Sequence, residues 1–365
     1  MSVYAQRYFK EIIMTDVYQN LARHLDNLPA GFPATETGVE IRILKRLFTP
    51  REAEIAASLV MMPELVAAIA GRLKMDEVEL APILYDMSRK GLIYRSGKHG
   101  QTFYMAAQFV VGIWEYHVKS LDLDLIKDFN EYSSSFMNKA WTETKTKQLR
   151  VIPISKSISA EMLTMPYNEA EQIIKKQSKI VVCPCICRVE HKMTGKGCDR
   201  PVEVCLTFGS GAYFYEENGL GRSISQSEAL EILAKGREAG LVLQPGNSQK
   251  PTNICLCCGC CCQILKNLNN LDEPAKAVHS NYFAEVSTDD CTGCGICLER
   301  CQMKAIVIED VAMVKKERCI GCGLCVTSCN FDAMRLIEKA PEDRWTPPAN
   351  TVETYINMAK ERGKI

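Results

Sequence analysis

The residues of this sequence with the most distinctive chemistry are its nineteen cysteines, none of which precedes Cys183. Eight of them, near the C-terminus, form two runs with the spacing C-x2-C-x2-C-x3-C. The first run is Cys291, Cys294, Cys297 and Cys301, and the second is Cys319, Cys322, Cys325 and Cys329. Clustered thiols in a reducing environment indicate a metal, redox chemistry or both. Two zinc sites are an alternative, but zinc ribbons pair CxxC motifs without a third and fourth thiol at these offsets.

The two runs, with the glycines repeated between their cysteines, resemble a bacterial-type two-cluster ferredoxin. The resemblance implies an α+β ferredoxin domain over residues 283–340 that holds two [4Fe–4S] clusters. It also implies that the fourth cysteine of each run binds the other run's cluster. The implied ligands are Cys291, Cys294, Cys297 and Cys329 for one cluster, and Cys319, Cys322, Cys325 and Cys301 for the other. Clusters interlaced in this way would lie near each other, so that electrons can hop between them.

Two glycines lie between the cysteines of each run. We expect these glycines to adopt positive φ and to bring backbone N–H groups toward the sulfurs, which helps to set the reduction potential. They are Gly293, Gly295, Gly321 and Gly323. The resemblance is broken after the fourth cysteine, where the family usually has proline and this chain has Gln302 and Asn330. Because proline removes a backbone donor, we expect ligation to survive and the potential to shift.

The other eleven cysteines lie between positions 183 and 262. One set is Cys183, Cys185, Cys187, Cys198 and Cys205, and the other is Cys255, Cys257, Cys258, Cys260, Cys261 and Cys262. Alternate residues of a strand share a face, so the first three thiols converge if their segment stays extended. In the second set, Cys255, Cys258 and Cys261 have the spacing of a cubane loop, and Cys257 and Cys260 form a second CxxC pair. We predict at least one further Fe–S cluster here, with zinc or a redox dithiol site as the alternatives.

Charged residues near these cysteines leave a catalytic interpretation open. Arg188, His191 and Arg200 could receive an anionic group at the central cluster. In the simpler interpretation, Arg188 hydrogen-bonds the surroundings of the cluster and His191 lies at the surface. The segments Phe208–Ala212 and Gly219–Gly221 are expected to be loops, and neither fits a phosphate-binding fingerprint. We therefore expect no nucleotide or flavin site.

Ahead of the cysteines, residues 38–120 resemble a winged helix–turn–helix domain. Helices are predicted at Gly38–Phe48, after Thr49, at Pro63–Leu73 and at Asp76–Lys90, followed by strands at Leu92–Arg95 and Thr102–Met105. Thr49 and Glu52 predict a capping box, and Pro82 is expected to kink the fourth helix. The fourth helix begins with carboxylates, which repel phosphate. We therefore expect this domain to dock a protein rather than a nucleic acid.

The segments between these regions show weaker patterns. Apolar spacing predicts one amphipathic helix over Gln108–Ile126. Asn168 is predicted to cap a helix that extends to Gln177 and leads into the strand Ile180–Val182. Ser225 is predicted to cap a further helix that ends near Gly240.

Together these patterns predict an α+β multidomain chain. Its segments are a helical leader (1–37), a winged-helix-like domain (38–120), a helical connector (121–178), a Cys-rich metal-binding domain (179–282), the ferredoxin domain (283–340) and a tail with a docking helix (341–365).

Composition limits the environment of the protein. The chain has 44 Lys and Arg against 44 Asp and Glu in 365 residues, so it has no overall attraction to nucleic acid or to an anionic membrane. No apolar run approaches the roughly 20 residues that cross a bilayer. Met1–Lys10 contains no apolar signal-peptide core. We expect a cytoplasmic protein without a membrane span.

The whole chain also resembles, more loosely, a group of iron–sulfur proteins of anaerobes. These combine a helical or winged-helix front, two cysteine-rich segments and a terminal ferredoxin module. We expect an electron-transfer protein or complex subunit that relays low-potential electrons between the ferredoxin clusters, the central cluster and a partner oxidoreductase or electron carrier. The alternatives are an enzyme with the central cluster as its active site and a redox-sensing winged-helix regulator.

Overall fold

The computed structural model describes residues 17–98, 100–158, 162 and 165–365. Packing divides the chain into two units. The first comprises the residues up to Lys145 together with Met358–Ile365, and the second comprises Thr146–Asn357. Helix and sheet are mixed, and among the described helices none combines the length and apolar character that crossing a bilayer would require. The finer division into six segments stays a prediction.

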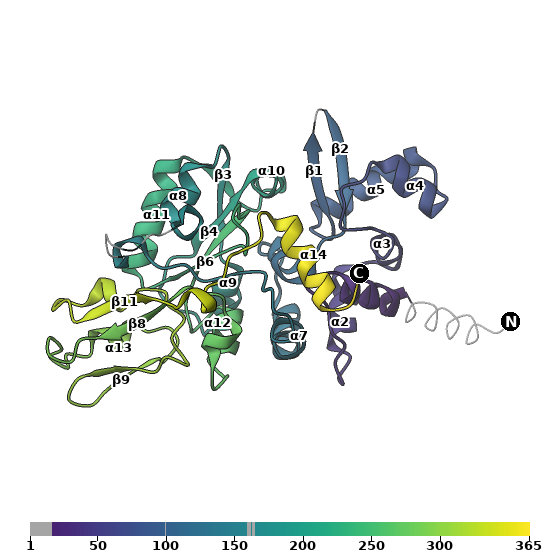
Figure 1. Ribbon diagram of the computed structural model, residues 1–365. Coiled ribbons are helices and arrows are strands. Elements are labelled where there is room, and N and C mark those ends of the chain that lie inside the picture. Colours follow the sequence, from purple (N-terminus) through teal and green to yellow (C-terminus); the bar gives the residue numbers. More distant parts are fainter. Residues whose placement is uncertain (1–16, 99, 159–161, 163–164) are drawn as a thin grey trace. The chain divides into compact units, whose positions relative to one another are not determined.

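The first unit begins with helices and one hairpin (Figure 1). Residues 17–27 are helical, and the next elements are α2 (Val39–Leu47), α3 (Pro50–Ala56), α4 (Val66–Leu73), α5 (Glu77–Arg89), β1 (Tyr94–Lys98) and β2 (Gln101–Met105). The predicted capping box is confirmed, because the Thr49 hydroxyl accepts from the Glu52 backbone N–H and the Glu52 carboxylate accepts from the Thr49 N–H at 2.8 Å. Helix α5 runs without interruption from Glu77 to Arg89 with Pro82 inside it, and the kink expected at Pro82 stays a prediction. Residues 1–16 of the predicted leader and His99 of the predicted hairpin turn lie outside the described residues.

The single helix predicted over Gln108–Ile126 is wrong. The segment contains an irregular stretch, η1 (Phe109–Ile113), whose backbone is not helical from Val110 to Gly112. It is followed by α6 (Trp114–Tyr116), and α7 (Leu123–Phe136) starts separately. Val111 takes a left-handed backbone with φ 53°, and the Asp122 carboxylate caps α7 by accepting from the Leu125 N–H at 2.7 Å. The break lets Trp114 stack on Phe129 with ring centroids 3.6 Å apart. Aromatic packing and a strong cap therefore override the apolar period.

The second unit contains a five-stranded antiparallel sheet of order β5-β3-β4-β7-β6. Its strands are β3 (Ile180–Pro184), β4 (Glu203–Phe208), β5 (Arg222–Ile224), β6 (Val242–Pro245) and β7 (Asn253–Cys257). On β7, Ile254 and Leu256 are buried on one face. Helix α11 (Gln226–Glu238) packs closely on that face, since a Cβ at Gly236 would lie 2.3 Å from Leu256 Cδ2. Cys255 and Cys257 therefore face the opposite side of the sheet.

Helices α8 (Ala170–Lys175), α9 (Ile186–Met193), α10 (Gly209–Glu217) and α12 (Gln263–Leu268) complete this region. The Ser225 cap is confirmed, because its hydroxyl accepts from the Glu228 N–H of α11 at 3.1 Å. Two expectations are wrong. Asn168 ends a short 3-10 helix, so α8 begins at Ala170 without a side-chain cap. The glycine-rich segment after Phe208 is the first turn of α10 rather than a loop, since Gly209 with φ 57° turns the chain directly from β4 into the helix.

The two cysteine runs lie in a small repeated fold within the second unit. Strand β8 (Tyr282–Val286) pairs with β11 (Met334–Glu338), and β9 (Ile306–Ile308) pairs with β10 (Ala312–Val314), both antiparallel. The short helices α13 (Ile296–Arg300) and η6 (Val326–Ser328) each carry the end of one run. The core between them joins apolar side chains such as Ile306 and Met334 to the buried Cys297 and Cys325.

The tail packs on its own chain. It contains η7 (Pro341–Asp343) and α14 (Thr351–Glu361). In the second unit, the buried Thr354 hydroxyl donates to the Asn247 carbonyl at 2.7 Å. In the first unit, Arg362 pairs with Asp26 at 2.9 Å. Internal contacts thus account for much of the tail, and its docking on a partner stays a prediction.

Candidate metal centres

Four thiols surround a cavity of about 330 Å³ beside α13. They are Cys291, Cys294, Cys297 and Cys329, here named the first quartet. The first three come from one run, and the fourth arrives from the other run just after η6. Apolar residues such as Ile308 and Met334 line the rest of the wall. The structure thus brings together the set that the ferredoxin resemblance implied for one cluster.

A second cavity, of about 380 Å³, repeats the arrangement. Its thiols are Cys301, Cys319, Cys322 and Cys325, here named the second quartet. Cys301 crosses over from the first run, so the two quartets are interlaced. Three ligand sulfurs accept backbone N–H bonds from the adjacent strands and turn: Cys319 from Ala284 at 3.3 Å, Cys301 from Ala305 at 3.2 Å and Cys291 from Ala312 at 3.3 Å. Such donors stabilise thiolate charge in an apolar site.

The glycines between the ligands adopt positive φ, as the sequence predicted. Their φ values are 66° at Gly293, 80° at Gly295, 65° at Gly321 and 75° at Gly323. At Gly321, a Cβ would lie 2.1 Å from the Tyr282 carbonyl oxygen. The Gly321 N–H also donates to the Cys319 thiol. This position therefore needs glycine for its backbone angle, for space and for the approach of its amide to a ligand.

Burial makes three thiols of the second quartet, those of Cys319, Cys322 and Cys325, difficult to ionise without a cation. It raises the pKa of Cys322 to about 12 and raises the pKa of Cys325 well above its ordinary value. A thiolate ligand must lose its proton when metal binds, so iron has to supply the compensating positive charge. Thiols on several sides of an apolar cavity, with amide donors behind them, fit a [4Fe–4S] cluster.

A row of thiols crosses three strands of the five-stranded sheet. Cys183 on β3 is the register partner of Cys205 on β4, and Cys205 lies opposite Cys255 on β7, one position beyond the Leu206–Ile254 pair. Residues directly opposite one another in a sheet share a face. The Cys205 and Cys255 sulfurs are accordingly 3.9 Å apart, and the Cys183 thiol donates to the Cys205 carbonyl at 3.2 Å.

Four further thiols extend this row, one at the end of β7 and three outside the strands. Cys257 contacts both Cys255 and Cys262, and Cys187 contacts both Cys185 and Cys262. The seven residues, here named the sheet group, are Cys183, Cys185, Cys187, Cys205, Cys255, Cys257 and Cys262. The segment of Cys183, Cys185 and Cys187 does not stay extended, because β3 ends at Pro184 and α9 begins at Ile186. Cys187 nevertheless joins the group from the first turn of α9.

Contacts among the thiols of the sheet group shift their pKa values in opposite directions. Hydrogen bonds with Cys183 and with Cys205 raise the pKa of Cys205 and of Cys255, respectively, well above the ordinary range. Cys262 has its pKa lowered well below that range, because the thiols of Cys187 and Cys257 both donate to it. Full deprotonation of this group therefore requires positive charge from a metal.

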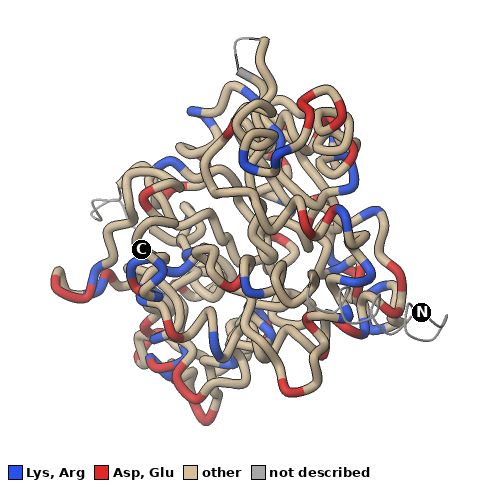
Figure 2. The backbone as a smooth tube through the Cα atoms, turned by 90° about the vertical axis from the view of Figure 1, so that its right-hand side faces the viewer, with Lys and Arg blue, Asp and Glu red and all other residues tan. Residues whose placement is uncertain are grey.

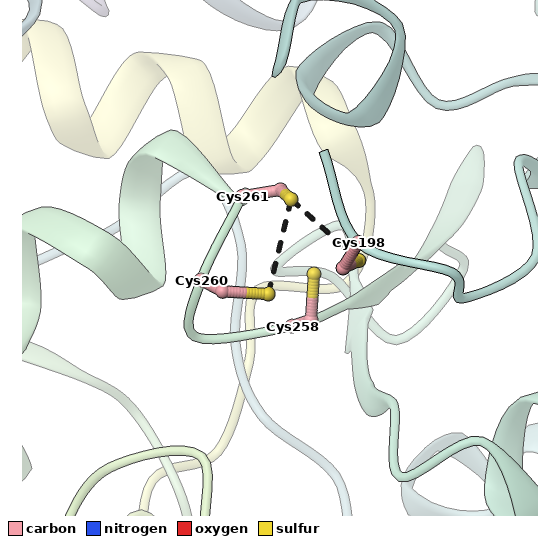
Figure 3. Close-up of side chains that lie close together, drawn as sticks. All are labelled: Cys198, Cys258, Cys260 and Cys261. Atoms are coloured by element: carbon pink, nitrogen blue, oxygen red, sulfur yellow. Dashed lines mark hydrogen bonds between the residues drawn. The ribbon is translucent and has the colours of Figure 1, made fainter. Parts of the chain in front are cut away.

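The other four central thiols form a tighter cluster, here named the compact group: Cys198, Cys258, Cys260 and Cys261 (Figure 3). All four sulfurs lie within 4.8 Å of one another. The Cys261 sulfur is 3.6 Å from that of Cys198 and 3.8 Å from that of Cys260. The three cysteines with the spacing of a cubane loop therefore do not gather at one site, since Cys255 belongs to the sheet group while Cys258 and Cys261 belong to the compact group. The reason is that β7 runs to Cys257 and the chain turns immediately after it.

Two arginines lie beside the central thiols. Arg188 is fully buried and donates to the Pro201 and Leu256 carbonyls at 3.0 and 2.8 Å, as the simpler interpretation expected. Burial acts to lower its pKa, but the nearby thiols of Cys185 and Cys258 outweigh this effect and raise it. Arg200 donates to the Cys260 sulfur at 3.4 Å.

Hydrogen bonds also set the pKa of Cys198 and the position of His191. Burial acts to raise the pKa of Cys198, but hydrogen bonds led by the Arg200 backbone lower it to about 6. His191 is not at the surface as predicted. It is among the buried residues of α9, and its Nδ1 lies 2.8 Å from the Cys187 carbonyl oxygen one helical turn earlier.

Gln302, which stands where the resembling family has proline, makes contacts that the sequence does not predict. It is buried, and its side-chain oxygen accepts from the Gly259 N–H at 2.8 Å. Its backbone oxygen accepts from the Asn269 side chain at 2.9 Å. Because Gln302 follows Cys301, it connects the second quartet to the turn that carries the compact group.

Comparison with known proteins agrees with the C-terminal part of this picture. Residues 290–333 match the family described as a 4Fe-4S dicluster domain. No curated protein and no solved structure matches the chain. The C-terminal segment is thus similar to an iron–sulfur domain, and the cysteine-rich centre adds a second potential metal-binding region.

Proposed function

We propose that this protein transfers electrons through two [4Fe–4S] clusters held by the first and second quartets. The observation that carries the proposal is the exchange of the fourth cysteine: Cys329 lines the first cavity and Cys301 the second. When bound, such clusters supply reversible one-electron exchange. The chain itself contributes thiols, amide donors and apolar walls that exclude water.

The sheet group is proposed to hold a further iron–sulfur cluster. Its seven thiols exceed the four that one cubane needs, and they come from strands, a helix turn and a helix cap rather than from a single loop. Gln244 and Asn253 place side-chain amides near this group, 3.9 Å from the Cys262 sulfur and 3.7 Å from the Cys255 sulfur. These neutral donors can stabilise thiolate or sulfide charge.

Exposure favours the first quartet as the point of exchange with a partner. Cys294 is exposed, and so are the neighbouring apolar side chains of Leu298 and Phe331. The second quartet is less accessible, with Cys325 buried, and Gln302 connects it to the central thiols. Electrons would therefore pass between an electron carrier or partner oxidoreductase, the first quartet, the second quartet and the sheet group.

The N-terminal helices and hairpin are proposed to form a winged-helix-like domain that docks a protein. The start of α5 carries Asp76 as its cap and the exposed Glu77 and Glu79. Arg95 in the hairpin is buried and donates to Ser88. Figure 2 shows acidic and basic residues interspersed along the described chain. These features favour protein docking over nucleic-acid binding. The residues of this domain therefore do not support the alternative of a redox-sensing winged-helix regulator.

A reducing compartment such as the cytoplasm is proposed for this protein, since its nineteen cysteines are all free thiols suited to metal binding. An anaerobic host, which the looser resemblance of the whole chain implies, stays a prediction.

The test is anaerobic purification followed by counting iron and acid-labile sulfide in the same sample. About eight iron atoms per chain are expected from the quartets alone, with more from the sheet group. Reduction should produce EPR signals of interacting reduced clusters. Colourless protein without inorganic sulfide would contradict the proposal.

A further inference from the structure

The compact group has the dimensions of a site for one metal ion. A tetrahedral ion with metal–sulfur bonds of about 2.3 Å places its four sulfurs about 3.8 Å apart. The measured separations of 3.6 Å between Cys198 and Cys261 and 3.8 Å between Cys260 and Cys261 agree with this. The remaining separations stay within 4.8 Å.

The same dimensions disfavour a cubane at this place. In a [4Fe–4S] cluster each thiolate binds a different iron, so its four cysteine sulfurs lie farther apart than four sulfurs on one ion. The quartets have that character, because the four thiols that line each of their cavities do not all lie within 4.8 Å of one another. Within the part of the chain that the structure describes, the compact group is the one set of Cys, His, Asp or Glu with at least three ligand atoms all within 4.8 Å.

Local backbone structure explains how the four thiols converge. Cys258, Gly259, Cys260 and Cys261 form one turn between β7 and α12, closed by the Cys262 N–H donating to the Cys258 carbonyl at 3.1 Å. Gly259 packs against Gln302, where a Cβ would lie 2.2 Å from the Gln302 carbonyl oxygen. Cys198 enters from the segment after α9 and completes the tetrahedron (Figure 3).

Four thiolates around a divalent ion leave a net charge of about −2, and the surroundings offset it. Arg200 donates to Cys260. The Arg188 guanidinium hydrogen-bonds Cys258. Because all four positions come from the protein, such a site is closed and structural rather than open to a substrate.

We propose that the compact group binds a single zinc ion, separate from the iron–sulfur clusters. Zinc is favoured over ferrous iron because it binds a given thiolate site more tightly in the order of divalent-metal affinities. The ion would fix the turn whose two neighbours, Cys257 and Cys262, are members of the sheet group. Its role is therefore to fix the position of β7 relative to α12 and so to position Cys257 and Cys262.

The experiment measures zinc, iron and sulfide together in the full chain, purified anaerobically from cells supplied with both metals. Wild-type protein should contain about one zinc per chain. The C198S/C260S double variant should lose that zinc and keep most of its iron and sulfide. The matched control C205S, altered in the sheet group, should keep its zinc and lose iron and sulfide.

X-ray absorption at the zinc edge of wild-type protein tests the site without any variant. Four sulfur neighbours at about 2.3 Å and no neighbouring metal are expected. Nitrogen or oxygen neighbours would overturn the proposal. Wild-type protein without zinc would also overturn the proposal. This holds whether the C198S/C260S variant then loses one iron without sulfide, loses a whole cluster or loses no metal. None of these results would remove the clusters of the quartets, so failure here is distinguishable from failure of the electron-transfer proposal.

Discussion

The quartets and the compact group use the same ligand and differ in what the ligands enclose. In each quartet four thiols surround a cavity, whereas in the compact group four thiols contact one another. A cavity is suited to a metal–sulfide core, and direct contact is suited to a single ion. We therefore base the proposed kind of centre on the distance between sulfurs rather than on the number of cysteines.

The quartets also differ from the sheet group in how their ligands are gathered. Three ligands of each quartet come from one short run, and glycine turns bring them together locally. The sheet group instead depends on strand register, since Cys183, Cys205 and Cys255 meet only when β3, β4 and β7 pair correctly. We expect the central centre to be coupled to folding of the sheet more strongly than the quartets are.

The largest expected effect is the loss of a whole cluster from a quartet. C294S and C329S should each lose about four iron atoms per chain, and the double variant should lose no more than either single one, because both residues serve the first quartet. C294S/C301S should lose about eight, although both residues belong to the same run. Iron and sulfide counting measures all four variants.

The same four variants would contradict the interlaced quartets if each cysteine run holds its own cluster. Additive losses in C294S/C329S, combined with a single-cluster loss in C294S/C301S, would mean that each run holds its own centre. The cavity linings would then have no bearing on ligation.

The next effect concerns the sheet group. C205S should lose central iron, and amide exchange in β4 and β7 should become at least about tenfold faster, because metal binding there stabilises the strands that carry the ligands. C294S should leave exchange in these strands unchanged. Hydrogen-exchange mass spectrometry compares the two variants, and equal protection of β4 in both would show that the central centre is not coupled to the sheet.

The same contrast explains what could be predicted from the sequence. The runs and the glycine conformations follow from local spacing, and so do the caps at Thr49 and Ser225. The division of the central cysteines does not, because the register of Cys205 against Cys255 depends on strands that two helices and two other strands separate in the sequence. The approach of Cys198 to Cys261 likewise depends on tertiary packing.

Glycine substitution separates space from backbone angle within the ferredoxin-like segment. G295A should cost about 1–2 kcal/mol, since φ is 80° there and nothing lies within 4 Å of the new Cβ. G321A should cost more and lower loading of the second quartet, because its Cβ would meet the Tyr282 carbonyl at 2.1 Å. Denaturant unfolding and iron content measure the pair, and equal costs would show that the segment relaxes freely around Tyr282.

The smallest effect tests the contact between the two regions. Q302A removes the acceptor for the Gly259 N–H, and one such bond contributes about 1 kcal/mol. The matched control is N330A, because Asn330 follows the fourth cysteine of the other run but is exposed, so its loss should cost less than about 0.5 kcal/mol. Water can reach the partly exposed Gly259, which keeps the cost of Q302A modest and should leave iron and zinc contents intact. Q302P should match Q302A if the side chain alone matters. Equal stability of Q302A and N330A in denaturant unfolding would mean that the quartets and the central thiols are joined by the backbone and not by this glutamine.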